Sequence, residues 1–174
     1  YSPARDAWEA LGSLPTEDND LASAAGLVSV QDAVYRYRND GPSADGNPYS
    51  ATLSIYPFDE QADEFSDEPL ALDAPIGSVD ALVSWGSRLV AVGTDLESNA
   101  AAITLIDPET GATQVLGTFP IGLTGANRAA VVSGDVLYVH EAASVTDEDA
   151  ADRIFAFDLK TGDEVQAVGT GPFD

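Results

Sequence analysis

A chain of 174 residues is the size of one ordinary domain, long enough to bury a substantial hydrophobic core. Its 30 acidic residues stand against 7 Lys and Arg, which gives a formal net charge of −23. This charge argues against nucleic acid and anionic membranes as partners, because both are bound through clusters of Lys and Arg. Cys is absent, which excludes disulfides, thiolate metal sites and a thiol nucleophile.

The acidity is a surface property, because hydrophobic residues still make up 44% of the chain. Lysine is reduced to one residue, Lys160. At molar salt the Debye length falls to about 3 Å and the repulsion between carboxylates is screened. The composition resembles that of halophilic archaeal proteins and predicts a high-salt habitat. An acidic secreted protein of a mesophile is the alternative. No apolar stretch is long enough to span a membrane, so no membrane insertion is expected.

Residues 1–19 allow two interpretations. Residues 10–15 form an apolar stretch that ends in Pro15, which suits the outer strand of a preceding repeat. Ser2 and Pro3, followed by Ala4, Trp8 and Leu11 at helical spacing, suit a short capped helix instead. The chain begins at Tyr1 and lacks Met, which suggests a processed product or part of a longer polypeptide.

Residues 20–75 contain four apolar stretches of strand length, at 27–29, 34–38, 53–59 and 70–75. Ser29 to Asp32 would also pass as a helix capping box. We favour strands, because the same pattern returns twice further along the chain.

The second and third units span residues 76–120 and 121–174. Their matching stretches lie at 82–84, 89–93, 103–107 and 115–120, and then at 131–133, 136–140, 154–158 and 167–172. Glycine-containing turns, with Gly86 and Gly134, separate the first two stretches of each unit and predict tight hairpins. Asp-x-x-Thr-Gly follows the third stretch, where Asp would cap the turn and Gly would supply a positive φ.

The four-stranded unit of about 50 residues, repeated three times, predicts an all-β fold: a β-propeller segment of three antiparallel blades at 20–75, 76–120 and 121–174, preceded by one strand or short helix. Three blades do not close a ring. We therefore expect the remaining blades of a larger propeller, or a partner subunit, to complete it.

At Asp107 to Gly111 and Asp158 to Gly162 the chain resembles the superfamily of quinoprotein-like and surface-layer propeller repeats, over about residues 20–172. Members that bind pyrroloquinoline quinone usually carry Trp shortly after the Thr-Gly pair. Here Ala112 and Asp163 follow instead, so no cofactor is expected.

The long connections at 39–50, 94–100 and 141–152 would share one face of a propeller, and one-sided insertions usually mark a binding side. Arg38, Gly93 and His140 look equivalent at the ends of their strands, and His140 beside Glu141 could act as an acid or base. The candidate binding residues are Arg38, Asp40, Asp45, Asn47, His140 and Glu141.

Acidic residues in these connections could bind a metal, and calcium is the ion that such oxygen ligands suit. The candidates are Asp40, Asp45, Asn47, Asp147, Asp149 and Asp152. Their spacing does not match the calcium loop motif, and a solvated acidic loop is the alternative.

The sequence therefore favours a non-catalytic extracellular or cell-surface module that binds a protein, glycan or cell-surface component through its long-loop face. The alternative is a catalytic propeller, such as a lactonase or sugar dehydrogenase, with an acidic metal or cofactor site.

Overall fold

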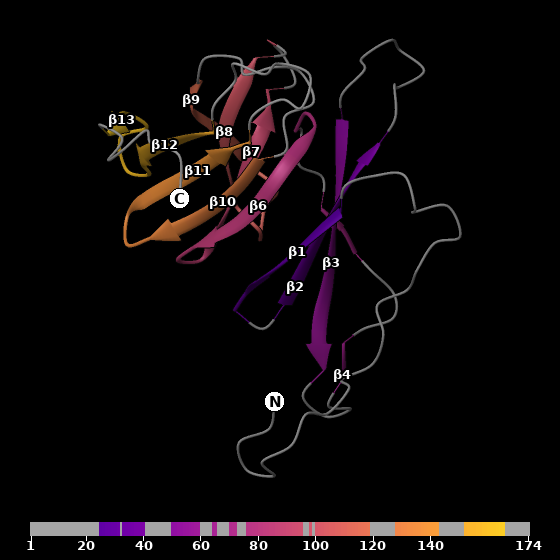
Figure 1. The fold of residues 1–174 in the computed structure, drawn as a ribbon. Helices are drawn as coiled ribbons and strands as arrows, with labels where there is room; N and C mark the ends of the chain where they lie inside the picture. The colour runs from indigo at the N-terminus through magenta and orange to yellow at the C-terminus, as the bar shows by residue number, and fades with distance from the viewer. Residues whose placement is uncertain are drawn as a thin grey trace.

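The computed structural model describes residues 25–31, 33–40, 50–59, 64–65, 70–72, 76–95, 98, 100–118, 128–142 and 152–165. Every regular element in this part of the chain is a β-strand, which confirms the predicted all-β class. Figure 1 shows the strands gathered into three sheets. The predicted element at 1–19 lies outside the described residues.

Sheet 1 contains β1 (Ala25–Val30), β2 (Ala33–Asp40), β3 (Ser50–Asp59), β4 (Glu64–Phe65) and β5 (Leu70–Leu72). It is antiparallel, and β4 and β5 both pair with β3, at its two halves. We predicted one fourth strand here and the structure has two short ones. The chain between β3 and β5 is longer than in the other sheets, which leaves room for the extra strand.

Sheet 2 contains β6 (Val79–Trp85), β7 (Arg88–Thr94), β8 (Ala101–Ile106) and β9 (Thr113–Thr118). Sheet 3 contains β10 (Arg128–Ser133), β11 (Val136–Glu141), β12 (Arg153–Asp158) and β13 (Glu164–Val165). Both are four-stranded, antiparallel and ordered as in the sequence. The helical alternative for residues 29–38 is wrong, because β1 and β2 occupy that segment as a hairpin.

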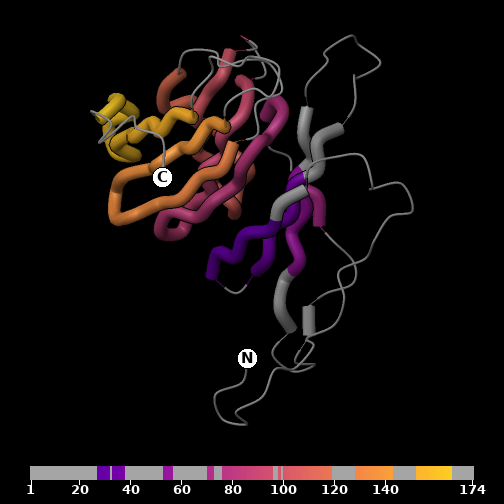
Figure 2. The backbone as a smooth tube through the Cα atoms, in the orientation of Figure 1, coloured from indigo at the N-terminus to yellow at the C-terminus, as the bar shows by residue number. Residues whose placement is uncertain are grey.

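The three sheets stack in a row through their first strands. β6 contacts both β1 and β10, so the middle sheet lies between the other two. Figure 2 shows the same order along the chain, with the indigo and purple sheet on one side of the magenta sheet and the orange and yellow sheet on the other.

Each sheet presents two faces, which we name from its second strand. The forward face carries Tyr35 and Tyr37 in sheet 1, Val90 and Val92 in sheet 2, and Tyr138 and His140 in sheet 3. The rear face carries the alternate residues, because successive side chains of a strand point to opposite sides. These are Val34 and Arg36, Leu89 and Ala91, and Leu137 and Val139.

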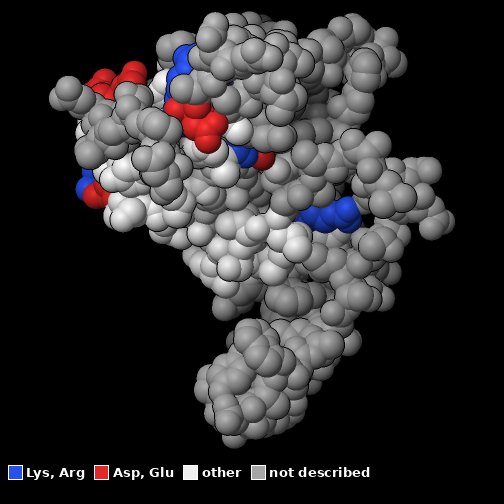
Figure 3. All heavy atoms as spheres, in the orientation of Figure 1, with Lys and Arg blue, Asp and Glu red and all other residues white. Residues whose placement is uncertain are grey.

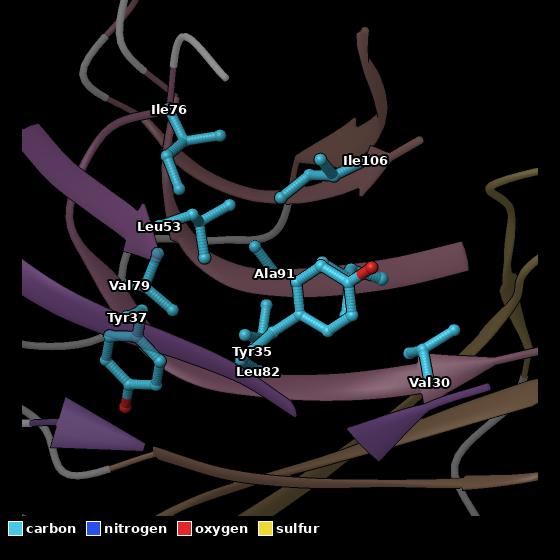
Figure 4. Close-up of a cluster of buried hydrophobic side chains, with 10 residues drawn as sticks. Val30, Tyr35, Tyr37, Leu53, Ile76, Val79, Leu82, Ala91 and Ile106 are labelled. Atoms are coloured by element: carbon cyan, nitrogen blue, oxygen red, sulfur yellow. The ribbon is translucent and has the colours of Figure 1, made fainter. Parts of the chain in front are cut away.

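Two hydrophobic clusters fill the spaces between sheets. The first joins the forward face of sheet 1, with Tyr35 and Tyr37, to the rear face of sheet 2, with Leu89 and Ala91. Figure 4 shows side chains of this cluster from the two sheets pointing toward one another. The second cluster joins the forward face of sheet 2 to the rear face of sheet 3. Both interfaces therefore pair a forward face with a rear face.

The first hairpin of each sheet has a two-residue loop. Val30 pairs with Ala33, Trp85 with Arg88, and Ser133 with Val136. The first loop residue has a positive φ in all three sheets: 52° at Gln31, 59° at Gly86 and 62° at Gly134. The predicted tight turns are confirmed in sheets 2 and 3, and sheet 1 adopts the same backbone without a glycine.

The Asp-x-x-Thr-Gly turns of sheets 2 and 3 have the same hydrogen bonds. The Asp107 carboxylate accepts from the backbone N–H groups of Glu109 and Thr110 at 2.9 and 3.2 Å. Asp158 accepts from Lys160 and Thr161 at 2.7 and 3.2 Å. Gly111 and Gly162 close the turns with φ of 73° and 80°. The predicted capping by Asp and the positive φ of Gly are thus confirmed.

Trp85 lies between sheets 2 and 3, as a packing residue. It packs against the second hydrophobic cluster, and its indole N–H donates to Asp135 Oδ1 at 3.3 Å. Asp135 also pairs with the Lys160 ammonium, and its carbonyl accepts from Leu159 N–H at 2.8 Å. These contacts hold sheets 2 and 3 together at the end that carries the two-residue hairpin loops, which we call the short-turn end.

Candidate functional site

Hydrogen bonds and ion pairs bring the strand ends that carry the long connections to one end of the stack, which we call the long-connection end. The end of β2 meets the start of β6, the end of β7 meets the segment before β6, and the end of β11 lies beside the start of β10. The three long connections leave from these places, at 41–49, 95–100 and 142–152. This end is the candidate site.

Asp80 joins sheets 1 and 2 at the long-connection end. It is the extra residue of a β-bulge, where the pairing of β6 with β7 shifts between Val79 and Ala81. Bulges leave a residue outside the ladder and redirect its side chain. The free carbonyl oxygen of Asp80 accepts from the Tyr37 hydroxyl of sheet 1 at 3.0 Å.

The Asp80 carboxylate connects sheet 2 to sheet 3 through Arg128. The guanidinium lies between two carboxylates, with Nη1 2.5 Å from Asp80 Oδ2 and Nε 3.1 Å from Glu141 Oε2. The side chains of Arg128 and Glu141 are only 7% and 6% exposed, and that of Asp80 is 27% exposed. These three residues form an ion triad at the seam of the stack.

Burial raises the pKa of the Asp80 carboxyl above its ordinary value. The hydrogen bond and charge of Arg128 act in the opposite direction, and the negative charge of Glu141 adds to the rise. Two carboxylates share one cation here, so the triad carries a formal charge of −1. Among the described side chains, every buried nitrogen and oxygen atom has a hydrogen-bond partner. The triad is therefore a joint between sheets with its polar atoms satisfied.

At the same end of sheet 2, the segment before β6 contacts the backbone at the end of β7 directly. Thr94 N–H donates to Ser78 O at 2.9 Å, and Ser78 N–H donates to Thr94 Oγ1 at 2.9 Å. A Cβ on Gly93 would lie 1.9 Å from Ser78 O, and one on Gly77 would lie 2.2 Å from Thr94 O. Both positions therefore need glycine for the close approach.

The strand pairing corrects one expected equivalence. Counted from the hairpin, Glu141 and not His140 occupies the position of Arg38 and Gly93. His140 and Glu141 are neighbours in β11 and point to opposite faces of sheet 3. Glu141 is buried in the triad, whereas His140 lies on the forward face. The two do not form an acid–base pair.

His140 instead contacts Asp152, with Nε2 3.1 Å from Asp152 Oδ2. Both side chains are well exposed, at 39% and 49%. His140 and Asp152 are among the binding and metal candidates, and the structure brings them together where the third long connection leaves β11 and returns to β12.

The other candidate residues are not brought together in the described structure. Arg38 and Asp40 lie in β2 at the long-connection end, and only their backbone is described. Asp45, Asn47, Asp147 and Asp149 lie outside the described residues. Within the part of the chain that the structure describes, no group of three or more His, Cys, Asp or Glu could hold a metal ion.

Sequence reasoning missed Asp80 and Arg128. Asp80 gave no signal, because a bulge depends on the register of β6 against β7. Arg128 did give one: in a chain with only 7 Lys and Arg, a cation that opens an apolar strand is expected to have a specific partner.

Figure 3 shows small groups of charged side chains separated by uncharged surface among the described residues on that side of the molecule. The chain matches no protein-family model and no curated protein. Within the described residues no helix is long and apolar enough to cross a membrane.

Proposed function

We propose that the chain is a non-catalytic β-propeller module that works outside the cell in high salt. Its long-connection end binds a glycan or protein of the cell surface. The observation that carries this proposal is the one-sided arrangement of the long connections. They leave from the ends of β2, β7 and β11, which the ion triad and the Ser78–Thr94 contacts hold at one end.

The ion triad supports a scaffold role for this end. Arg128 and Glu141 are buried and paired with each other, so they are not free to reach a substrate. A buried joint beneath variable connections is a common way to present a binding surface on a rigid framework. The three sheets stacked through their first strands agree with propeller blades, in which neighbouring sheets stack around an axis.

The proposal is tested by binding in molar NaCl to a glycan array and to isolated cell-envelope glycoprotein from a halophile. The loop variant changes Asp45→Ala and Asn47→Ala in the first long connection. The matched control changes Ser87→Ala and Glu109→Ala at the short-turn end. We expect the loop variant to weaken binding at least tenfold while the control binds like the unchanged chain.

Two results would contradict the proposal. One is the absence of binding to every glycan and to the envelope glycoprotein. The other is turnover of a lactone or sugar substrate, which would favour a catalytic propeller. Calcium as a ligand of the long connections is tested by repeating the binding assay with millimolar calcium and with chelator. The melting temperature is measured under both conditions, because an ion that binds only the folded state raises it.

A further inference from the structure

We propose that the forward face of sheet 3 binds a neutral sugar residue, which stacks on Tyr138 and donates a hydrogen bond to His140. This contact rests on the glycan-binding function proposed above and assigns described residues to it. The two can be tested apart, because glycan binding elsewhere on the chain would persist without this contact.

Four residues of β10 and β11 form a patch on this face, which we call the forward patch. Val131 pairs with Tyr138, and Ala129 pairs with His140. All four point to the same side, because cross-strand partners share a face and Tyr138 and His140 are two residues apart. Val131 is 61% exposed, Tyr138 39%, and the His140 side chain 39%, and Ala129 is exposed too. Ala156, the partner of Tyr138 in β12, is 3% exposed and lies outside the patch.

The forward patch differs from the forward face that sheet 3 covers. Tyr138 holds the hairpin position that Val90 has in sheet 2. His140 holds that of Val92. Both valines are 0% exposed and pack against the rear face of sheet 3. Covering an imidazole–carboxylate pair with a similar apolar face would remove its hydration without replacing it. The patch therefore suits a ligand that carries hydrogen-bonding groups of its own.

The hydrogen bond to Asp152 determines what His140 offers such a ligand. The Asp152 carboxylate accepts from Nε2, so in the neutral ring Nε2 carries the proton and Nδ1 is an acceptor. Both side chains are well exposed. Nδ1 can therefore accept a hydrogen bond from a hydroxyl of a ligand on the patch.

Tyr138 supplies a stacking surface beside that acceptor. The face of an aromatic ring is electron-rich and attracts C–H groups, which a sugar ring presents on its apolar side. Val131 extends the apolar surface next to the ring. Tyr138 and His140 are about 7 Å apart along β11, two residues of a strand. A hexose, with a flat C–H face and hydroxyls at its edge, matches a ring and an acceptor in this arrangement.

The charge of the chain favours a neutral sugar. The forward patch holds no Lys or Arg, and the net charge of −23 repels an anionic sugar at low salt. At molar salt the Debye length is about 3 Å, so attraction to a cationic ligand is screened as well. Stacking and hydrogen bonds persist under both conditions.

The probes are linear hexaoses of glucose, mannose and galactose, with polygalacturonate as the anionic counterpart. Calorimetric titration in molar NaCl measures their binding. Tyr138→Ala removes the ring, Tyr138→Phe keeps the ring without its hydroxyl, and His140→Ala removes the acceptor. Val115→Ala is the matched control, because Val115 is an exposed apolar residue of β9, at 44%. Urea unfolding verifies that all variants fold.

We expect at least one neutral hexaose to bind the unchanged chain, and polygalacturonate not to bind. Tyr138→Ala should weaken binding of that hexaose at least tenfold, because the stacking contact is lost. His140→Ala should weaken it too, and Tyr138→Phe should restore most of the affinity that Tyr138→Ala loses. Val115→Ala should bind like the unchanged chain.

Equal binding of the hexaose by the unchanged chain and Tyr138→Ala would overturn this contact and leave the proposed function standing. So would binding of the envelope glycoprotein without binding of any hexaose. No binding to any glycan or to the envelope glycoprotein would overturn both. Self-association that Tyr138→Ala abolishes would assign the forward patch to a second copy of the chain, and would overturn the sugar contact.

Discussion

Arg128 connects sheet 3 to sheet 2 directly and to sheet 1 through Asp80. Its guanidinium bridges Asp80 of sheet 2 and Glu141 of its own sheet, and the Asp80 carbonyl in turn holds Tyr37 of sheet 1. A buried ion pair adds little net stability, because burial costs both ions their hydration. Removing one partner is far more damaging, because the other charge stays buried without compensation.

We therefore expect Arg128→Leu to lower the free energy of unfolding by about 3 to 5 kcal/mol. The double variant Arg128→Leu with Glu141→Leu should lose less than the single variant, because the buried Glu141 carboxylate is removed together with the cation and only the partly exposed Asp80 carboxylate remains in the seam. Urea unfolding in molar NaCl measures both. Equal losses in the two variants would show that the missing cation, and not the stranded Glu141 carboxylate, determines the loss of stability.

Gln31 occupies a backbone conformation that the other two sheets assign to glycine. Its φ of 52° matches 59° at Gly86 and 62° at Gly134. A residue with a Cβ in this left-handed region costs roughly 1 to 2 kcal/mol. Gln31 is exposed, so its side chain contributes no burial that would offset the cost.

Gln31→Gly should raise the free energy of unfolding by about 0.5 to 1 kcal/mol, because the relief of strain exceeds the extra chain entropy of glycine. Gly134→Ala is the reverse change. A Cβ there meets nothing within 4 Å, so only the backbone strain acts and stability should fall by a similar amount. Thermal and urea unfolding of both variants measure the effect, and a loss of stability in Gln31→Gly would contradict it.

At the scale of the element, the turns after the third strands could be predicted from sequence because the whole signal is local. Asp, Thr and Gly lie within five residues and supply the cap, a second hydrogen bond and the positive φ. The strands of the three hairpins could be predicted as well, since the same apolar spacing recurs. The bulge at Asp80 and the split fourth strand of sheet 1 could not, because both depend on pairing between segments.

The Asp107 turn leads us to predict how the stability of the fold depends on pH. Hydrogen bonds from the Glu109 and Thr110 backbone lower the pKa of the Asp107 carboxyl below its ordinary value. A group whose pKa is lower in the folded state stabilises the fold above its unfolded pKa, about 3.9 for Asp. That contribution disappears as the pH falls through the folded value.

Asp107→Asn keeps a side-chain oxygen that can accept both hydrogen bonds and removes the titrating group. We expect this variant to lose less melting temperature than the unchanged chain between pH 5 and about pH 3. Asp107→Ala should be less stable than the unchanged chain at pH 7, because the turn loses its cap. Calorimetry across this pH range measures both, and identical pH profiles for the unchanged chain and Asp107→Asn would contradict the assignment.

At the scale of the whole molecule, each of the three sheets lies within one of the ranges 20–75, 76–120 and 121–174. The repeat indicates units of equal construction, and equal construction implies equal stacking, so the order of sheets follows from the sequence. The candidate site was harder to predict from the sequence. Composition alone indicates its loop residues, whereas Asp80 and Arg128 organise this end only through contacts between sheets.

The charge of −23 gives a prediction for the whole chain, because repulsion among carboxylates favours the unfolded state and acts over the Debye length. That length shrinks from about 10 Å at 0.1 M salt to about 3 Å at 1 M. The melting temperature should therefore rise by several degrees over this range. Salt also strengthens apolar burial, so the rise alone does not identify its cause.

A variant that removes three exposed negative charges separates the two causes: Glu109→Gln, Asp163→Asn and Glu164→Gln. Its control keeps the charge at the same positions, with Glu109→Asp, Asp163→Glu and Glu164→Asp. If repulsion dominates, the neutralised variant melts higher than the control at 0.1 M NaCl, and the difference shrinks at 1 M because salt has already screened those charges. A difference that is the same at both concentrations would assign the salt effect to apolar burial instead.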